Sequence, residues 1–396
     1  MLSQRCVDLG TAPSVIRELF EYGKLRAKEV GADKVFDFSI GNPSVPPPHE
    51  VQETLARLLT TVDPLTLHGY TSAQGDLAVR EQLAASLSKR FGHEYTASQL
   101  YLTVGAAAAL CCVFHALTVP GDEYILFAPY FPEYKVFIEG AGARVNILPP
   151  QYPDFQIDLN ALEAAVNEHT KAVLINSPNN PSGAVYTPET LNALGKLLED
   201  KSPQYGHPIY LISDEPYREL TYDSVTTPWT PDFYRDTIVF YSYSKSLSLP
   251  GERIGYVLVG RSVTDSETVY AAVAGAGRTL GYVNAPSLFQ RVAATCDGLR
   301  ADVGVYAENR RLLTEELGKL GYDTAHPPQG TFYYFLPTLE PDDVAFCQQA
   351  KALDLLLVPG SGFGAPGYAR LSFCVPTDRI RGAIPGFHAL AQRYGR

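Results

Sequence analysis

The sequence lacks any apolar run of the roughly 18 residues that a membrane-spanning helix needs. The N-terminal stretch MLSQRCVDLGTAPSVIRELF also lacks the features of a secretory signal, which are a charged start, an apolar centre and a small-residue cleavage site in that order. We therefore expect a protein of the cytoplasm that carries no membrane anchor.

Patterns for disulfide bonds and metal ions are missing as well. The eight histidines show no spacing such as HExxH, and the six cysteines form no CxxC pair. The cysteines are Cys6, Cys111, Cys112, Cys296, Cys347 and Cys374. We expect free thiols in a reducing compartment and no metal site.

The chain has fewer positively charged than negatively charged residues. The chain has 32 Lys and Arg against 43 Asp and Glu, which gives a net charge of −11. This balance argues against nucleic acid or an anionic membrane as the main partner, so any anion site must be built locally. A hydrophobic fraction of 45% and a charged fraction of 19% are typical of a globular protein with a large core.

Strand-like and helix-like stretches alternate through the middle of the chain. This order predicts an α/β fold with a mostly parallel sheet, because parallel strands need helical crossovers. The predicted strands are 100–104, 123–128, 144–148, 171–176, 209–213, 237–242 and 254–260, and the predicted helices include 50–60, 75–91, 105–117, 159–168, 188–199 and 303–319. Later strand candidates at 331–337, 355–360 and 369–375 indicate a small α+β sheet. We expect a large domain at 49–284 and a smaller one formed by 1–48 and 285–396.

Polar residues follow several of these strands. Asp214 comes directly after 209–213, and Lys245 lies between serines just after 237–242, with Arg253 beyond it. The loop SPNNPSG follows 171–176, and the small residues of GAAAAL follow 100–104, where backbone N–H groups can approach an anion. Each signal alone also fits a cap, a loop or helix packing. Together they predict one site, because ligands of open α/β sheets lie outside the carboxyl ends of the strands.

The glycine-rich stretch PGSGFGAPG at 359–367 is a different case. It does not open a strand–helix–strand unit, so we do not interpret it as a nucleotide-binding loop.

These residues form part of an ordered set of motifs. The set comprises SIGNPS (39–44), HGYTSAQGDLAVREQLA (68–84), SPNNPSG, SDEPYREL, SYSKSLSLPGERIGY, PGSGFG and YARLSF (368–373). It resembles the class I aminotransferases of the aspartate aminotransferase superfamily, which use pyridoxal 5′-phosphate (PLP). The resemblance covers nearly the whole chain. It implies the PLP type I fold, with a seven-stranded, mostly parallel sheet between helices and a small α+β domain built from both chain ends.

The resemblance implies roles for the polar residues at the strand ends. Lys245 resembles the lysine that holds PLP as a Schiff base and then moves the substrate proton. Asp214 resembles the aspartate that pairs with the pyridine nitrogen. Tyr217 and Asn180 resemble the partners of the PLP 3′-oxygen, and Asn180 also belongs to the substrate side.

Further residues match the family's contacts to the phosphate and the ring. The resemblance assigns the phosphate to Ser242, Arg253 and the backbone N–H groups of Ala106 and Ala107. Ser244 either assists them or is a turn residue. Phe131 matches the aromatic side chain that stacks on the PLP ring, although a phenylalanine in the core would look the same.

The substrate and the partner subunit are implied in the same way. Arg370 resembles the arginine that binds the substrate α-carboxylate in a fork, and Gly41 lets the N-terminal segment approach that carboxylate, unless it is a plain turn glycine. Tyr70 resembles the tyrosine that reaches the phosphate of the neighbouring subunit. The protein is then a homodimer with shared active sites.

The motifs leave the amino donor open. Aspartate is favoured, with Arg278 or Arg17 as the hypothetical reader of its distal carboxylate, although either can be a surface arginine and Arg278 lies about one residue from the family's position. The helix start VGAAAAL, where relatives often carry Thr, Ser or Lys, weakens the case for a dicarboxylate. Aromatic donors are possible, and 2-oxoglutarate is the expected acceptor.

Two other functions compete with an aminotransferase. A C–S β-lyase on the same fold would share PLP and the lysine, and it would release pyruvate and ammonia without a keto-acid acceptor. An amino-acid-sensing regulator would need an N-terminal DNA-binding domain, yet the family match starts by about residue 12 and the chain is acidic.

Overall fold

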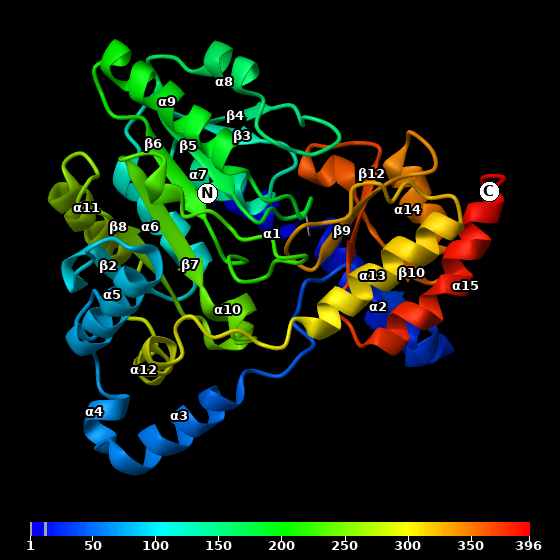
Figure 1. Ribbon diagram of the computed structural model, residues 1–396, viewed down its shortest axis with the longest axis horizontal. Coiled ribbons are helices and arrows are strands. Elements are labelled where there is room, and N and C mark those ends of the chain that lie inside the picture. Colours follow the sequence, from blue (N-terminus) through cyan, green and yellow to red (C-terminus); the bar gives the residue numbers. More distant parts are fainter. Residues whose placement is uncertain (1, 12–13) are drawn as a thin grey trace.

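The structure is a computed structural model that describes residues 2–11 and 14–396 (Figure 1). Its centre is a seven-stranded sheet in the order β2-β8-β7-β6-β5-β3-β4. The strands are β2 (Leu100–Thr103), β3 (Glu123–Phe127), β4 (Arg144–Leu148), β5 (Thr170–Asn176), β6 (Tyr210–Asp214), β7 (Thr237–Ser242) and β8 (Gly255–Val259). Only β8 runs antiparallel to its neighbours β2 and β7 within this described sheet. The predicted mostly parallel sheet is confirmed.

Helices cover both faces of this sheet (Figure 1). One face packs on α6 (Ala106–Leu117), α7 (Glu133–Gly140) and α11 (Ser266–Thr279). The other face packs on α8 (Leu159–Ala165) and α9 (Pro188–Tyr205), and on α3 (His49–Thr61), α5 (Leu77–Phe91) and α12 (Ser287–Thr295). Successive side chains of a strand point to opposite faces, so strands covered on both sides become continuous apolar runs. Phe240, for example, packs in the core on the α6 side of the sheet, and Val239 packs in the core on the α5 side.

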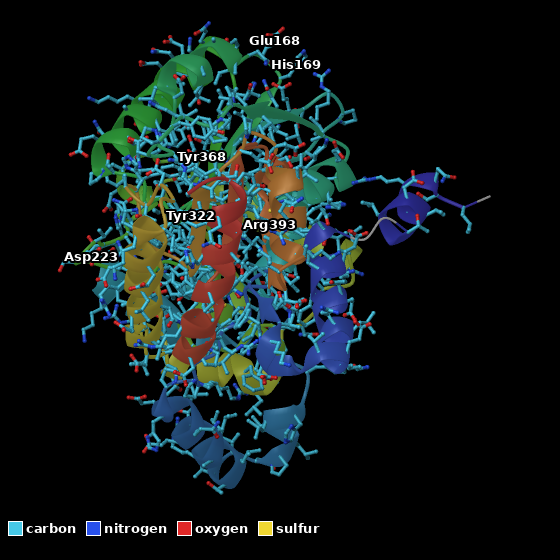
Figure 2. All side chains as sticks on the ribbon, turned by 90° about the vertical axis from the view of Figure 1, so that its right-hand side faces the viewer. Glu168, His169, Asp223, Tyr322, Tyr368 and Arg393 are labelled. Carbon is cyan, nitrogen blue, oxygen red and sulfur yellow. The ribbon has the colours of Figure 1, made fainter. Side chains whose placement is uncertain are left out.

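A second group of elements unites the two ends of the chain. Its sheets are the antiparallel set β11 (Val358–Pro359), β12 (Tyr368–Ser372) and β9 (Tyr333–Pro337), and the parallel pair β1 (Phe36–Asp37) with β10 (Leu355–Leu356). Its helices are α2 (Val15–Val30), α13 (Gly304–Lys319), α14 (Asp343–Lys351) and α15 (Thr377–Arg393), and Figure 2 shows α13 and α15 side by side. One core, which includes Phe38 and Phe387, joins the early and late segments.

The remaining elements are short or peripheral. They are α1 (Gln4–Thr11), α4 (Pro64–His68), α10 (Tyr243–Ser246) and five 3-10 turns at Ala32–Lys34, Ala97–Gln99, Thr230–Asp232, Pro250–Glu252 and Gly360–Phe363. No helix in the described ranges is both long and apolar enough to cross a bilayer. The boundaries of the two expected domains stay a prediction; α12, just beyond residue 284, packs on α3 and α5.

The parallel strands bring their carboxyl ends to one edge of the sheet. Asn176 at the end of β5 pairs in register with Asp214 at the end of β6, and Ser242 ends the neighbouring strand β7. The polar residues that follow these strands therefore meet at this edge, as the sequence predicts.

Two glycines inside helices provide a test of the packing, and substituting them should have opposite effects on stability. A Cβ on Gly195 of α9 would lie 2.0 Å from the backbone oxygen of Phe233, whereas a Cβ on Gly275 of α11 would meet nothing within 4 Å among the described atoms. We expect Gly195→Ala to destabilise the fold by about 1–3 kcal/mol despite the better helix propensity of alanine. Gly275→Ala should stabilise it by up to about 1 kcal/mol. Urea unfolding of both variants measures this, and equal effects of one sign would contradict the described packing.

Candidate active site

A cavity of about 310 Å³ opens at the carboxyl edge of the large sheet. Its walls come from the strand ends of β5, β6 and β7, from the start of α6, and from the small-domain segments around Gly41 and Arg370. Four charged side chains line it, namely Asp214, Lys245, Arg253 and Arg370. The cavity therefore lies between the two parts of the fold and collects charges from both.

Lys245 projects into the cavity from α10, which begins immediately after β7. The Ser242 hydroxyl caps this short helix by accepting from the backbone N–H of Ser244 at 3.2 Å. Lys245 Nζ donates to the backbone oxygen of Gly41 at 2.8 Å. Burial lowers the pKa of Lys245 to about 8, and Arg253 and Arg370 add to the lowering, against an opposing effect of Cys374. A sizeable share of this amine is thus neutral near pH 8, as a base or nucleophile must be.

Asp214 ends β6 and is fully buried. One carboxylate oxygen, Oδ2, accepts a hydrogen bond from the Tyr134 hydroxyl at 2.5 Å, and the other, Oδ1, has no partner among the residues that the structure describes. Burial raises the pKa of Asp214 to about 7, while the bond from Tyr134 lowers it and the charge of Glu215 raises it. An unpaired buried carboxylate oxygen is costly, so this atom points to a cationic N–H group that the chain itself does not supply.

Positive groups gather at the start of α6. Gly105, with φ +84°, precedes the helix, and a Cβ there would lie 2.7 Å from Arg253 Nη2. Glycine is thus needed both for the backbone conformation and for the approach of the guanidinium. The hydroxyls of Ser242 and Ser244 lie 2.7 Å apart on the same side of the cavity. Helix N–H groups, two hydroxyls and an arginine form a site suited to a phosphate.

Arg370 lies on β12 and is 2% exposed. Its Nη1 donates to Asn180 Oδ1 at 3.1 Å and its Nη2 to the backbone oxygen of Ser39 at 2.6 Å, whereas Nε has no partner in the described part of the chain. Burial lowers its pKa. The guanidinium packs on the ring of Tyr333 at 4.5 Å. No carboxylate of the described residues pairs with it, so it is suited to a carboxylate from a ligand.

Tyr217 is buried beside this group. Its hydroxyl donates to the hydroxyl of Tyr333 at 3.2 Å. A Cβ on Gly41 would come within 1.9 Å of that Tyr333 oxygen, which explains why position 41 carries glycine rather than a larger residue. Gly41 therefore has a packing role in addition to accepting from Lys245.

Most of the residues predicted from the sequence line this one cavity. They are Gly41, Ala106, Ala107, Phe131, Asn180, Asp214, Tyr217, Ser242, Ser244, Lys245, Arg253 and Arg370. Tyr70, Arg278 and Arg17 lie outside its lining, on the surface of the chain; Tyr70 is 98% exposed. The roles of all these residues stay predictions.

Sequence reasoning missed several residues of the cavity. Tyr134 and Asn176 contact Asp214, through its carboxylate and its backbone oxygen respectively, and Tyr333 contacts Tyr217. Asn176 could have been predicted from the sequence, since it ends the strand that neighbours the Asp214 strand. The apolar residues Ile16, Ile40, Leu110 and Phe137, which also line the cavity, gave no signal beyond core packing.

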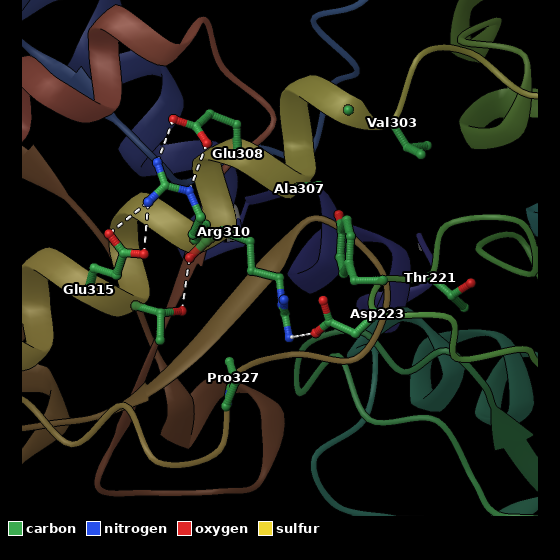
Figure 3. A pocket seen from close by; sticks show the side chains of 12 residues that line it. Thr221, Asp223, Val303, Ala307, Glu308, Arg310, Glu315 and Pro327 are labelled. Atoms are coloured by element: carbon green, nitrogen blue, oxygen red, sulfur yellow. Dashed lines mark hydrogen bonds and ion pairs between the residues drawn. The ribbon is translucent and has the colours of Figure 1, made fainter.

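A larger open depression of about 680 Å³ lies elsewhere, along α13 (Figure 3). Its charged side chains are already paired with one another: Arg310 pairs with Asp223 at 2.7 Å, and Arg311 pairs with Glu308 and Glu315 at 2.9 and 2.7 Å. Size alone would favour this depression. The unpaired buried groups favour the smaller cavity as the functional site.

Comparison with known proteins agrees with this choice. The family described as aminotransferase class I and II matches residues 33–385. The chain belongs to this family. It is therefore a transaminase, and the family is PLP-dependent.

Individual relatives span the full length of the chain. An aspartate aminotransferase of Thermotoga maritima is 33% identical over 97% of each chain. An aspartate/prephenate aminotransferase of Thermus thermophilus is 30% identical over 92% of each chain. A crystal structure of an amino transferase from Eubacterium rectale superimposes with a TM-score of 0.97, at 51% identity and full coverage of both chains. The predicted type I fold is thus confirmed.

The cavity of this aminotransferase fits PLP on its own chemistry. The unpaired Asp214 Oδ1 suits a protonated pyridine nitrogen, and the start of α6 with Arg253 suits the phosphate. Lys245, with its lowered pKa, suits the aldehyde carbon. No cluster of three or more metal-ligating side chains occurs in the described ranges.

The buried carboxylate predicts a pH-dependent cost in the cofactor-free protein. Because the pKa of Asp214 in the folded state is about 7, above the ordinary value of 3.8, its protonated form stabilises the fold at low pH. That stabilisation is lost as the pH rises from about 4 to about 7. We expect Asp214→Asn to stabilise the cofactor-free protein at pH 8 by a few kcal/mol, at most, relative to its effect at pH 4.

Urea unfolding of the cofactor-free wild type and variant at both pH values measures this difference. Adding PLP should reverse the order at pH 8, because only the wild type offers a charged partner to the pyridine nitrogen. A difference that is the same at both pH values would show that Asp214 does not titrate in this range.

Proposed function

We propose that this aminotransferase binds PLP in the described cavity and transfers an amino group from an L-amino acid to a 2-oxo acid such as 2-oxoglutarate. Transfer takes place in two half-reactions of ping-pong type. The observation that carries this proposal is the combination of a buried Lys245 and an unpaired Asp214 oxygen in one cavity. The aspartate aminotransferase relatives support it.

Bound PLP supplies an electron sink for the electron pair left when the substrate α-proton is removed. The chain's residues make that sink effective. Asp214 would keep the ring nitrogen protonated, because it offers a carboxylate that the Tyr134 hydroxyl already holds in place. Phe131 would support the ring from one side, and Tyr217 and Asn180 would contact the 3′-oxygen.

Lys245 Nζ carries the proton. With the cofactor bound, the neutral amine would take the proton of the substrate α-carbon onto Nζ and later release it from Nζ, so that one group would serve as base and then as acid. The low pKa favours this role, since an amine with an ordinary pKa would be almost fully protonated near pH 8. The bond to Gly41 O shows that Nζ can hold a fixed place in the cavity.

Arg370 holds the substrate by its α-carboxylate. Its free Nε and the adjacent Nη donors can form two parallel hydrogen bonds with the carboxylate, which fixes the α-carbon relative to Lys245. Asn180 keeps the guanidinium in place through the bond at 3.1 Å.

The side chain of the amino donor would be recognised at the open end of the cavity. Within one chain the described cations that line the cavity are Lys245, Arg253 and Arg370, and the remaining walls are largely apolar. Aspartate, the donor that we favour, therefore needs a further cation, from Arg17 of the same chain or from a second subunit. A homodimer in which Arg278 and Tyr70 cross to the partner's cavity supplies it, and their exposure leaves them free to do so. The Thermus thermophilus aspartate aminotransferase, whose structure contains the dicarboxylate maleate, supports this donor class.

Replacing the lysine tests the reaction itself. We expect Lys245→Ala to lower kcat at least about 1000-fold, because the proton carrier is lost. Glutamate formation from 2-oxoglutarate and aspartate is the measurement. Pyruvate release from a cysteine conjugate by the wild type, without a keto-acid acceptor, would instead identify a β-lyase. A variant whose kcat is within tenfold of the wild-type value would refute the role of Lys245.

Two arginines test the donor. We expect Arg278→Ala to reduce kcat/KM for aspartate about 10- to 100-fold, because a desolvated charged pair is lost, and to leave kcat/KM for an aromatic donor unchanged. Arg17→Ala is the matched control, and it should leave kcat/KM for aspartate unchanged if Arg278 binds the distal carboxylate. If both variants keep full activity with aspartate, neither arginine reads the distal carboxylate.

A further inference from the structure

A layer of buried polar groups lies behind the turn that carries Lys245, outside the lining of the cavity. We propose that Arg90 is a positioning residue for Lys245: it holds together two carboxylates, Asp297, which is hydrogen-bonded to Tyr243 before the lysine, and Glu219, which is connected through Tyr241 to Ser246 after it. The inference rests on the proposed function, in which Lys245 Nζ carries the substrate proton.

The first arm starts before the lysine. Tyr243 is 1% exposed, and its hydroxyl donates to Asp297 Oδ1 at 2.8 Å. The side chain of Asp297 is 1% exposed, and its Oδ2 accepts a further bond from the Ser86 hydroxyl at 2.6 Å. The N-terminal side of the turn is therefore fixed to a buried carboxylate.

The second arm starts after the lysine. The Ser246 hydroxyl lies 2.8 Å from the hydroxyl of Tyr241, which in turn donates to Glu219 Oε2 at 2.6 Å. Tyr241 is the donor in both contacts, so its single hydroxyl proton is shared between the serine oxygen and the carboxylate. The backbone oxygen of Ser246 also accepts from Ala301 N at 2.7 Å. The C-terminal side of the turn is thus fixed to a second carboxylate.

Arg90 joins the two arms. It is the penultimate residue of α5, which ends at Phe91. Its Nη2 donates to Glu219 Oε1 at 2.7 Å, and its Nη1 donates to Asp297 Oδ2 at 3.1 Å. Removing one partner of buried charges leaves the others uncompensated, which costs far more than a surface pair. Without this guanidinium the two carboxylates repel each other, and the two sides of the lysine turn lose their fixed separation.

The nearby Arg218 is not a substitute. Its Nε is bound to Glu215 Oε2 at 2.6 Å. Its guanidinium lies over the rings of Phe91, Trp229 and Tyr241, at 5.1, 4.7 and 4.6 Å. It is held beside the layer and cannot move between the two carboxylates without leaving these contacts.

The experiment uses the PLP-loaded enzyme carrying Arg90→Gln, with Arg90→Lys as the conservative variant. Lys89→Gln on the same helix, at an exposed side chain, is the matched control. We expect Arg90→Gln to lower kcat about tenfold or more while KM for the amino acid changes less than about twofold, because Arg370 is untouched. The pH at which the near-ultraviolet absorption of the bound cofactor changes should move as well, since this absorption reports the bond to Lys245. Arg90→Lys should recover part of both effects, and Lys89→Gln should match wild type.

A second change separates positioning from general stability. Adding Asp297→Asn to Arg90→Gln removes one of the two repelling charges, so we expect kcat and the pH midpoint to move back toward wild type. An Arg90→Gln variant with wild-type kcat and pH midpoint would overturn the proposal. So would a loss of kcat matched by a rise in KM and not rescued by Asp297→Asn.

If Arg90→Gln fails to fold, Tyr243→Phe and Tyr241→Phe take its place. Each removes one hydroxyl of one arm and keeps the ring. A lowered kcat with unchanged KM and a shifted pH midpoint in both would support the proposal, and wild-type values in both would overturn it. A wild-type enzyme that forms no glutamate would instead refute the proposed function, and this inference with it.

Discussion

The site depends on one constraint, which is that charged groups buried at the edge of the large sheet have incomplete partners. Asp214 offers an oxygen and Arg370 an N–H group that the described residues leave unpaired. Burial also pushes the pKa values of Asp214 and Lys245 toward each other, to about 7 and about 8. Such groups reduce the stability of the empty fold, and a ligand with a cationic nitrogen and an anionic carboxylate removes that cost. The strength of ligand binding and the cost to the empty protein thus have the same origin.

The large sheet limits this cost because the ends of its strands fix Asp214 directly and fix the starting point of the short helix that carries Lys245. Asn176, Asp214 and Ser242 end adjacent parallel strands whose other residues are buried on both sides. Small shifts of any one strand would disturb its neighbours' packing, so the strand ends stay in register. Arg370 comes from the second sheet. The expected substrate contact at Arg370 therefore depends on how the chain ends pack against the large sheet, whereas most of the expected cofactor contacts come from the strand ends of that sheet and from the loops and helix starts that follow them.

The sequence was sufficient to predict the fold and most of the cavity, for a physical reason. Residues such as Asp214 and Lys245 directly follow apolar strands, and parallel strands must end at the same edge. No comparable pattern marks Tyr134, which reaches Asp214 from the helix α7, or Tyr333, which reaches Tyr217 from β9. Their contacts arise from helix and sheet packing between distant segments. A tyrosine in an apolar helix or strand is also a common core residue, so composition cannot single it out.

For the same reason, the sequence pattern leaves more than one amino donor open. In the proposed function the α-carboxylate is bound by Arg370 of the same chain, but the lining residues Ile16, Leu110 and Phe137 offer a distal carboxylate no charge. Arg278 and Tyr70 are exposed in the single chain, so both are accessible to a second subunit. In the proposed homodimer, specificity for an acidic donor would depend on the partner subunit, while the proposed proton transfer at Lys245 would need only groups of one chain. Changes to the surface around Arg278 would then alter the donor without altering the groups proposed to move the proton.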